Sequence, residues 1–272
     1  MNFWLSIGLT AALGITIEAL VLLMLLPMLK RSGVVRENFQ EVYIPAAVGI
    51  TFPITILLCY IALELAGVYG GEVYTLYLAA VALICLLGLL DDLIGTRESL
   101  GFRGHFSRLF KGELTTGALK ALGVGFISLF LAVFLSSDAI DIVVNTLLLA
   151  LFTNIINLLD LRPGRAIKGF LFFAVIIMLL VRVDYLMFIP LMAAVLFYFP
   201  FDLRAKAMMG DAGSNVLGFS LGLACVMGME FSFRVGTVIL LILIHIFTEK
   251  YSLTKIIERV GVLRYLDELG RS

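Results

Sequence analysis

The chain has 272 residues, of which 61% are hydrophobic and only 15% are charged. A soluble globular domain carries far more charge, so this composition excludes that class and predicts a protein that resides in lipid. The formal net charge is zero, which gives no support to a nucleic-acid partner. The three cysteines are isolated in apolar segments without metal-ligand spacing, so we read them as packing residues.

Apolar runs predict the helices. A helix needs about 20 apolar residues to cross the hydrocarbon core of a bilayer. Nine runs approach this length, at residues 3–29, 43–66, 73–90, 118–136, 139–158, 168–183, 185–201, 213–230 and 234–250. We therefore predict an all-α integral membrane protein, a polytopic bundle of about nine transmembrane helices that forms one domain over residues 1–272. Glu18 lies near the middle of the first run, where a carboxylate is costly, and both a structural and a functional role are open.

The basic residues predict the orientation of this bundle. Alternate threading places the polar segments 30–42, 91–117, 159–167 and 202–212 on one side, together with the C-terminal tail. All of the 20 Lys and Arg residues except Arg182 and Arg234 fall on that side or at the adjoining helix ends. The positive-inside rule makes this side cytoplasmic and places the N-terminus outside. The tail, residues 251–272, has apolar residues at helical spacing, which predicts an interfacial helix on the inner leaflet or against its own bundle, with a partner-binding motif as the alternative.

Polar groups that could perform chemistry begin at the end of the third run. Asp91 and Asp92 are adjacent carboxylates where this run meets the cytoplasmic side, and a solvated helix end is the alternative interpretation. The following segment supplies His105, which could bind phosphate or relay a proton, although a lone loop histidine more often does neither. Lys120 lies about one turn inside the fourth run and is the better candidate for binding phosphate.

A polar stripe ends the fifth run. Asn154, Asn157 and Asp160 follow i, i+3, i+6 spacing, which keeps them broadly on one helix face. Amides both donate and accept hydrogen bonds, so the stripe suits a nucleobase or a sugar, and bridging between helices is the alternative. Arg162 and Arg165 follow directly, and their guanidinium groups suit a phosphate or an anionic lipid headgroup.

The segment before the eighth run combines glycines with a carboxylate. Gly210 and Gly213 flank Asp211 where the apolar run begins. Glycines allow close backbone approach, free amides at a helix start favour anions, and an aspartate supplies a hard oxygen ligand for Mg²⁺. Asp211 as a simple N-cap is the alternative. The convergence of carboxylates, amides and cations on one face favours a metal-bridged phosphate substrate.

At these residues the chain resembles the polyprenyl-phosphate N-acetylhexosamine-1-phosphate transferase superfamily, glycosyltransferase family 4. Three motifs in the family's order carry the resemblance, and they occupy residues 91–95, 154–160 and 210–214. The resemblance implies that a UDP-sugar reacts with undecaprenyl phosphate at the inner membrane, with Mg²⁺ as cofactor, to release UMP and form a lipid-diphosphate-linked sugar for cell-envelope glycans. The expected partners are these substrates and membrane lipids, and a homodimer is left open.

The resemblance also implies roles for individual residues of this chain. Asp91, Asp92 and Asp211 look like the catalytic residues, and Asp211 and Asp92 look like the metal ligands. The substrate-binding residues would be Lys120, Asn154, Asn157, Asp160, Arg162, Arg165 and His105.

Three departures from the family pattern indicate a divergent branch. Pro163 stands where a second aspartate is usual, the first-loop motif is reduced to residues 44–49, and a late histidine cluster is replaced at residues 248–251. The rival interpretation is a catalytically weakened relative that binds polyprenyl phosphate or organises envelope proteins. A transporter would place its charges near the midplane instead, and the opening motif of a CDP-alcohol phosphatidyltransferase is not found.

Overall fold

The computed structural model describes residues 3–68, 71–95, 108, 111–181 and 184–271. Each of the nine predicted apolar runs overlaps an α-helix in these ranges, which confirms the all-α prediction. The helices are α1 (Phe3–Arg31), α2 (Thr51–Leu65), α3 (Glu72–Ile94), α5 (Thr116–Leu135), α6 (Ala139–Leu159), α7 (Arg165–Leu180), α8 (Tyr185–Leu203), α9 (Asp211–Gly228) and α10 (Phe231–Lys250).

Seven segments of the described chain are long and apolar enough to cross a membrane, namely α1, α2 with the turn before it, α3, α5, α6, α8 and α10. The number nine therefore stays a prediction. Helix α7 has only 16 residues. Helix α9 begins with a polar turn and packs against α3, α6 and α7, and its residues 212–226 are buried. Because α9 is surrounded by protein, it does not need the apolar surface that a lipid-facing helix requires.

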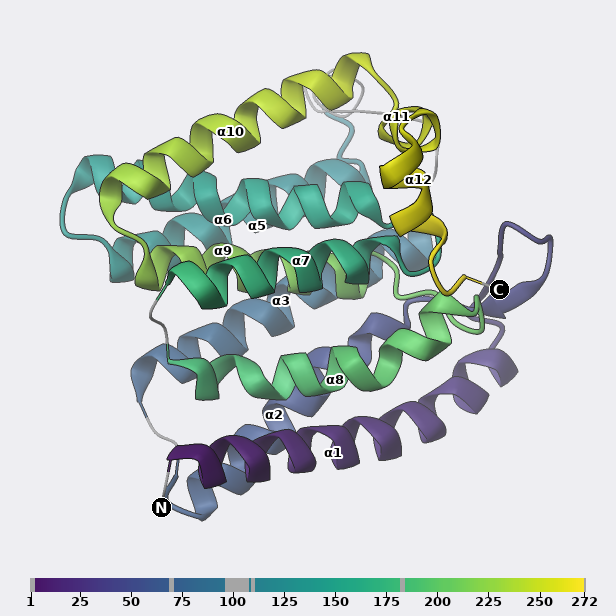
Figure 1. The fold of residues 1–272 in the computed structure, drawn as a ribbon, viewed down its shortest axis with the longest axis horizontal. Coiled ribbons are helices and arrows are strands. Elements are labelled where there is room, and N and C mark those ends of the chain that lie inside the picture. Colours follow the sequence, from purple (N-terminus) through teal and green to yellow (C-terminus); the bar gives the residue numbers. More distant parts are fainter. Residues whose placement is uncertain (1–2, 69–70, 96–107, 109–110, 182–183, 272) are drawn as a thin grey trace.

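Successive helices run in alternating directions (Figure 1). The N-terminus lies at one end of the bundle, on the left of the view. The turns after α1, α6 and α8 and the C-terminal segment gather at the other end. The predicted one-sided placement of the polar segments therefore agrees with the fold, while the assignment of that side to the cytoplasm stays a prediction.

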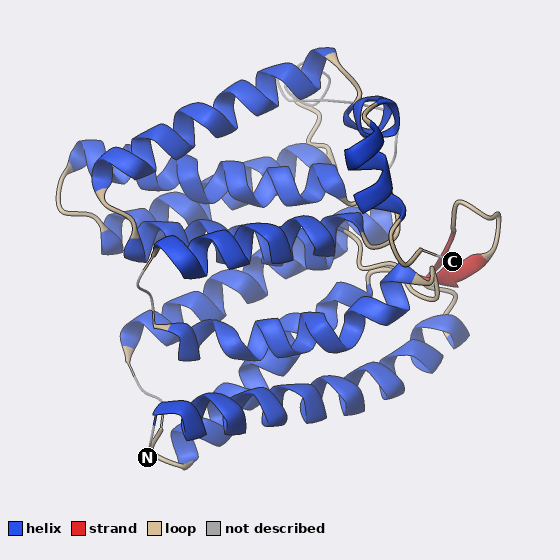
Figure 2. Ribbon diagram, in the orientation of Figure 1, coloured by secondary structure: helices blue, strands red, loops and turns tan. Residues whose placement is uncertain are grey.

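The second predicted run was wrong at its start. Residues 43–47 are not α-helical: strand β1 (Val35–Glu37) pairs antiparallel with β2 (Tyr43–Pro45), and a short 3-10 helix, η1 (Val48–Ile50), precedes α2. Figure 2 shows this hairpin projecting from the polar end of the bundle. Pro45 lacks an N–H group, and Ala47 adopts φ 57°, so the helix cannot extend back through this segment.

The segment before α2 is held instead by the chain that precedes α9. Met208 donates its backbone N–H to the Pro45 carbonyl at 2.8 Å, and Val48 and Gly49 donate to the carbonyls of Met208 and Met209 at 3.0 and 2.9 Å. A side chain at Gly49 would overlap the backbone of Gly213. The loop therefore fixes the position at which α9 begins.

The C-terminal tail forms two short helices rather than the one that we predicted. They are α11 (Leu253–Arg259) and α12 (Gly261–Glu268), and Val260 joins them in an extended conformation. Several apolar side chains of the tail are exposed, among them Val262 and Tyr265. Asp267 is buried, so one face of α12 is attached to the protein.

Candidate functional site

A cavity of about 610 Å³ opens at the polar end of the bundle. Its walls come from the ends of α3, α5 and α8, the turn after α6, the start of α9 and the β-hairpin. The charged residues that line it are Arg36, Glu37, Asp91, Asp92, Asp160, Arg162, Asp202 and Asp211. The volume is in the range of about 300–1,000 Å³ that small-molecule sites usually occupy.

Three helices bring a lysine between two aspartates at this cavity. The Lys120 ammonium lies 2.8 Å from Asp91 Oδ2 and also contacts Asp211 Oδ2. The three side chains come from α5, α3 and α9 and are largely shielded from solvent. Shielding strengthens the attraction between these charges, so the cluster is a preformed arrangement of one cation and two carboxylates. The sequence-predicted residues Asp91, Asp211 and Lys120 are therefore brought together.

Asp92 has a different environment from Asp91. Its two carboxylate oxygens accept the backbone N–H groups of Asp211 and Ala212, each at 3.0 Å. Asp92 therefore caps the N-terminus of α9 from a neighbouring helix, while Gly210 occupies the N-cap position with φ 72°. A side chain at Gly210 would overlap the Asp92 carboxylate. The capping role that we considered for Asp211 is thus performed by Asp92, and Asp211 remains directed at Lys120.

The turn after α6 forms another wall. Asp160 and Arg162 line the cavity, and Asp202 at the end of α8 accepts the Gly164 N–H at 2.7 Å. Burial raises the pKa of the Asp160 carboxyl well above its usual value, and the charges of Asp202 and Asp211 raise it further. A site this rich in carboxylates favours a cationic group or a metal-bound anion.

The remaining predicted residues have other positions. Asn157 accepts a hydrogen bond from the Ser214 hydroxyl at 2.9 Å, and neither it nor the half-buried Asn154 lines the cavity. Arg165 does not line the cavity and binds Asp267 of α12. His105 lies outside the described residues.

Three charged residues that line the cavity were missed by the sequence interpretation, namely Arg36, Glu37 and Asp202. Arg36, on the hairpin, lines the cavity and donates to the Asp92 carbonyl at 2.9 Å. Its position in a basic segment of the predicted cytoplasmic face was a weak signal. Asp202 also lines the cavity, and as a single carboxylate at the end of an apolar run it had no distinguishing pattern.

The donor set is compatible with Mg²⁺. Within the described residues, no three His, Cys, Asp or Glu side chains converge as a preformed cage. Asp91 and Asp211 nevertheless share a cation, the Lys120 ammonium. Mg²⁺ is usually bound by one or two carboxylates together with substrate phosphates and water, so this pair fits the ion when an anionic substrate completes the coordination.

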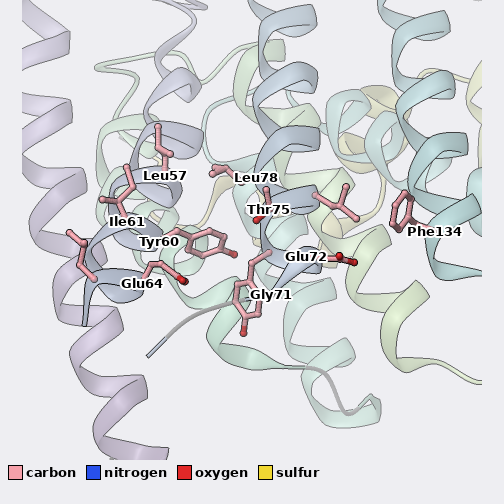
Figure 3. A pocket seen from close by; sticks show the side chains of 12 residues that line it. Leu57, Tyr60, Ile61, Glu64, Gly71, Glu72, Thr75, Leu78 and Phe134 are labelled. Atoms are coloured by element: carbon pink, nitrogen blue, oxygen red, sulfur yellow. The ribbon is translucent and has the colours of Figure 1, made fainter. Parts of the chain in front are cut away.

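A second cavity, of about 670 Å³, lies at the opposite end of the bundle, where α2 ends and α3 begins. Figure 3 shows Tyr60, Glu64 and Glu72 around it, with Phe134 on another helix. Its described lining is mostly apolar and contains no cation. The cavity at the polar end therefore remains the candidate active site.

Comparison with known proteins agrees with this choice. A search of curated proteins finds no match to this chain. The family model described as Glycosyl transferase family 4 matches residues 74–229, more than half of the chain, and this range contains Asp91, Asp92, Lys120, Asp160 and Asp211. The family implies a transferase, in general one that moves a sugar phosphate to a polyprenyl phosphate. The chain belongs to glycosyl transferase family 4.

Proposed function

We propose that this protein transfers a sugar-1-phosphate from a UDP-sugar to undecaprenyl phosphate and releases UMP. One observation carries the proposal: Asp91 and Asp211 line the cavity, and the Lys120 ammonium contacts both of them. The residues that line the cavity come from the end of the bundle where polar segments begin, so a water-soluble nucleotide sugar and a lipid phosphate could both reach it. We further propose that this end faces the cytoplasm at the inner membrane and that the product serves cell-envelope glycan synthesis.

In the proposed reaction, an oxygen of the lipid phosphate forms a bond to the sugar-bearing phosphorus. The bond from this phosphorus to the bridging oxygen breaks, and UMP leaves with the electron pair. The second pKa of a phosphate monoester is about 6, so the attacking phosphate is largely ionised at pH 7 and needs no general base. The protein must therefore bring two anions together and stabilise charge on the departing phosphate.

The residues of the cavity suit these tasks. The Lys120 ammonium can hold a phosphate oxygen while Asp91 and Asp211 keep the lysine in position. Arg36 and Arg162 lie on separate walls of the cavity and can bind oxygens of the donor diphosphate. Asp160 is placed to accept hydrogen bonds from a sugar or a nucleoside.

Mg²⁺ is part of the proposal. Asp211 would hold it, with Asp91 as the second carboxylate rather than the Asp92 of the sequence hypothesis, because Lys120 contacts one oxygen of Asp91 and one of Asp211, whereas both Asp92 oxygens accept backbone N–H groups. Charge neutralisation on the diphosphate is the chemistry that a bound Mg²⁺ would supply.

The decisive experiment incubates purified protein with Mg²⁺, undecaprenyl phosphate and a panel of UDP-sugars while UMP and lipid-linked sugar are measured. We expect both products in equal amounts with at least one donor. Asp211→Asn should lower the activity at least about 100-fold. Even the loss of a residue that only supports a metal ligand lowers activity about 10–100-fold, and Asp211 is proposed as a ligand itself.

A matched control comes from the other end of the bundle. Asp141, in the first turn of α6, forms an ion pair with Arg234 at 2.7 Å, whereas the cavity is lined by the turn that follows the other end of this helix. Asp141→Asn should leave the specific activity close to that of the wild type. Turnover that survives Asp211→Asn, or turnover without Mg²⁺, would refute the assigned roles. Absence of product with every donor would favour the non-catalytic relative that binds polyprenyl phosphate.

A further inference from the structure

Helix α12 is attached to the start of α7 by a buried ion pair. Asp267 accepts two hydrogen bonds from Arg165, from Nε at 2.7 Å and from Nη2 at 2.9 Å. Only 8% of the Asp267 side chain and 5% of the Arg165 side chain are exposed. A bidentate pair in a shielded site fixes orientation as well as distance. Arg165 also donates to the Thr254 hydroxyl of α11 at 3.0 Å, so both short helices are tied to one guanidinium.

Further contacts attach the tail to the residues beside Arg165. Arg271 forms an ion pair with Asp267 at 3.0 Å and donates from Nε to the Pro163 carbonyl at 3.2 Å. Lys168 donates to the carbonyls of Leu266 and Asp267 at 2.9 and 2.8 Å, which satisfies acceptors at the end of α12. The tail thus contacts the chain at three nearby positions, 163, 165 and 168.

These positions flank the turn that forms a wall of the cavity. Residues 160–163 line the cavity, and Gly164 follows with φ 76°. From inside the bundle, Asp202 accepts the Gly164 N–H at 2.7 Å. From outside, Asp267 and Arg271 hold Arg165 and the Pro163 carbonyl. The turn is therefore clamped between α8 and the C-terminal tail, where Glu258 of α11 also forms an exposed 4.0 Å ion pair with Arg162.

The ionisation of Asp267 agrees with this geometry. Burial alone would raise the pKa of its carboxyl, but hydrogen bonds from Arg165 and Arg271 outweigh burial and lower the pKa to about 2. The carboxylate is therefore charged throughout the physiological pH range, and both guanidinium groups have a permanent partner.

We propose that Asp267 is a positioning residue, which holds the turn at residues 160–164 through Arg165 and Arg271 and thereby sets the affinity of the cavity for its nucleotide-sugar donor. Arg165 changes from a predicted phosphate ligand to part of this clamp. The clamp involves α12, which lies outside the matched range 74–229, so the family match does not account for it. The part of the proposal that concerns donor affinity rests on the proposed function.

A stabilising ion pair without influence on the site is the competing explanation, and the molecule contains a matched pair that separates the two. Asp141 and Arg234 also form a 2.7 Å ion pair, with side-chain exposures of 8% and 12%, and it joins α6 to α10 at the opposite end. Asp267→Asn and Asp141→Asn therefore remove one carboxylate charge each from pairs of similar length and burial. Only the Asp267–Arg165 pair adjoins the turn that lines the cavity.

The first measurement is amide hydrogen exchange on the full-length protein in detergent, without substrates. We expect Asp267→Asn to speed exchange at residues 161–168 by about 10-fold or more, because the opening free energy of this segment falls. Asp141→Asn should leave these amides unchanged. Unchanged exchange in Asp267→Asn, or equal acceleration in both variants, would overturn the clamp whether or not the protein is a transferase.

The second measurement compares kcat and KM for the UDP-sugar. We expect Asp267→Asn to raise KM about fivefold or more with kcat within about twofold, because the clamp acts on binding rather than on the reacting atoms. Asp267→Glu, which retains the charge, should recover part of the loss. If Asp267→Asn does not fold, Arg271→Gln removes the Pro163 contact and should raise KM alone. A fall in kcat at constant KM would overturn the positioning role, whereas an inactive wild type would refute the proposed function and leave the exchange result to decide the clamp.

Discussion

Replacing Asp92 with asparagine should destabilise the start of α9 even when Mg²⁺ is absent. The carboxylate accepts the N–H groups of Asp211 and Ala212, each at 3.0 Å. Asparagine offers one oxygen, so one of these amides would face an NH₂ group instead of an acceptor. A hydrogen bond to a charged group contributes about 1.5–3 kcal/mol, and a negative charge at a helix N-terminus adds about 0.3–1 kcal/mol. Reduced repulsion among the neighbouring aspartates offsets part of this loss, so we expect a net loss of about 2 kcal/mol.

Thermal unfolding in detergent with a metal chelator tests this prediction. For a chain of this size, about 2 kcal/mol corresponds to a fall in melting temperature of roughly 4–8 °C. Asp91→Asn is the matched control because Asp91 faces Lys120 and its side chain does not cap α9. This control should shift the melting temperature less than Asp92→Asn does. Two results together would refute the capping assignment and restore Asp92 as a metal ligand. The Asp92→Asn variant would be as stable as the wild type without Mg²⁺, and it would fail to gain stability when Mg²⁺ is added.

Three further predictions concern the site and its supports. Lys120→Met should lower the rate of transfer, measured as UMP release, by at least about 100-fold. The change removes a positioned cation from a shielded site and leaves the carboxylates of Asp91 and Asp211 without it. Gly49→Ala should reduce the activity and should lower the free energy of unfolding by about 1–3 kcal/mol, because the new side chain overlaps the backbone of Gly213. Gly236→Ala is the control: the space at Gly236 is open, so this variant should change neither quantity. The pKa of Asp267 is lowered to about 2, so the contribution of its carboxylate to the stability of the fold is complete above about pH 4 and is lost as the pH falls towards 2. The difference in unfolding free energy between wild type and Asp267→Asn should therefore shrink by about 2 kcal/mol between pH 6 and pH 2.

The helices and the Asp–Lys centre were predictable because both follow from local patterns. Apolar runs approach the length that a bilayer requires, and each coincides with a helix in the described chain. Asp91, Lys120 and Asp211 lie at helix ends that alternate threading brings to one face, so their proximity followed from topology. The same reasoning placed Asp160 and Arg162 at that face.

What the sequence did not reveal depends on contacts between distant segments. Asp92 and Asp91 are neighbours with the same side chain, and only the position of α9 makes one a cap and the other a lysine partner. In the sequence Arg165 resembles a phosphate ligand, but in the structure it binds Asp267, which lies 102 residues later in the chain. The hairpin that carries Arg36 was not predicted, because its second strand, β2, lay within a predicted helix start, where an apolar run of strand and turn residues resembles a helix in composition.

The division of the site between matched and flanking segments suggests where its chemistry and its selectivity reside. The centre of Asp91, Lys120 and Asp211 lies within residues 74–229, whereas Arg36 and the clamp residue Asp267 lie outside them. A reacting phosphate needs the same charges whatever sugar it carries, so family members can share the centre. Under the proposed function the walls would contact the parts of the donor that differ between substrates, and two residues that form or support these walls, Arg36 and Asp267, lie outside the matched range. Changes in the flanks should therefore alter which donor binds, and changes in the centre should alter whether any donor reacts.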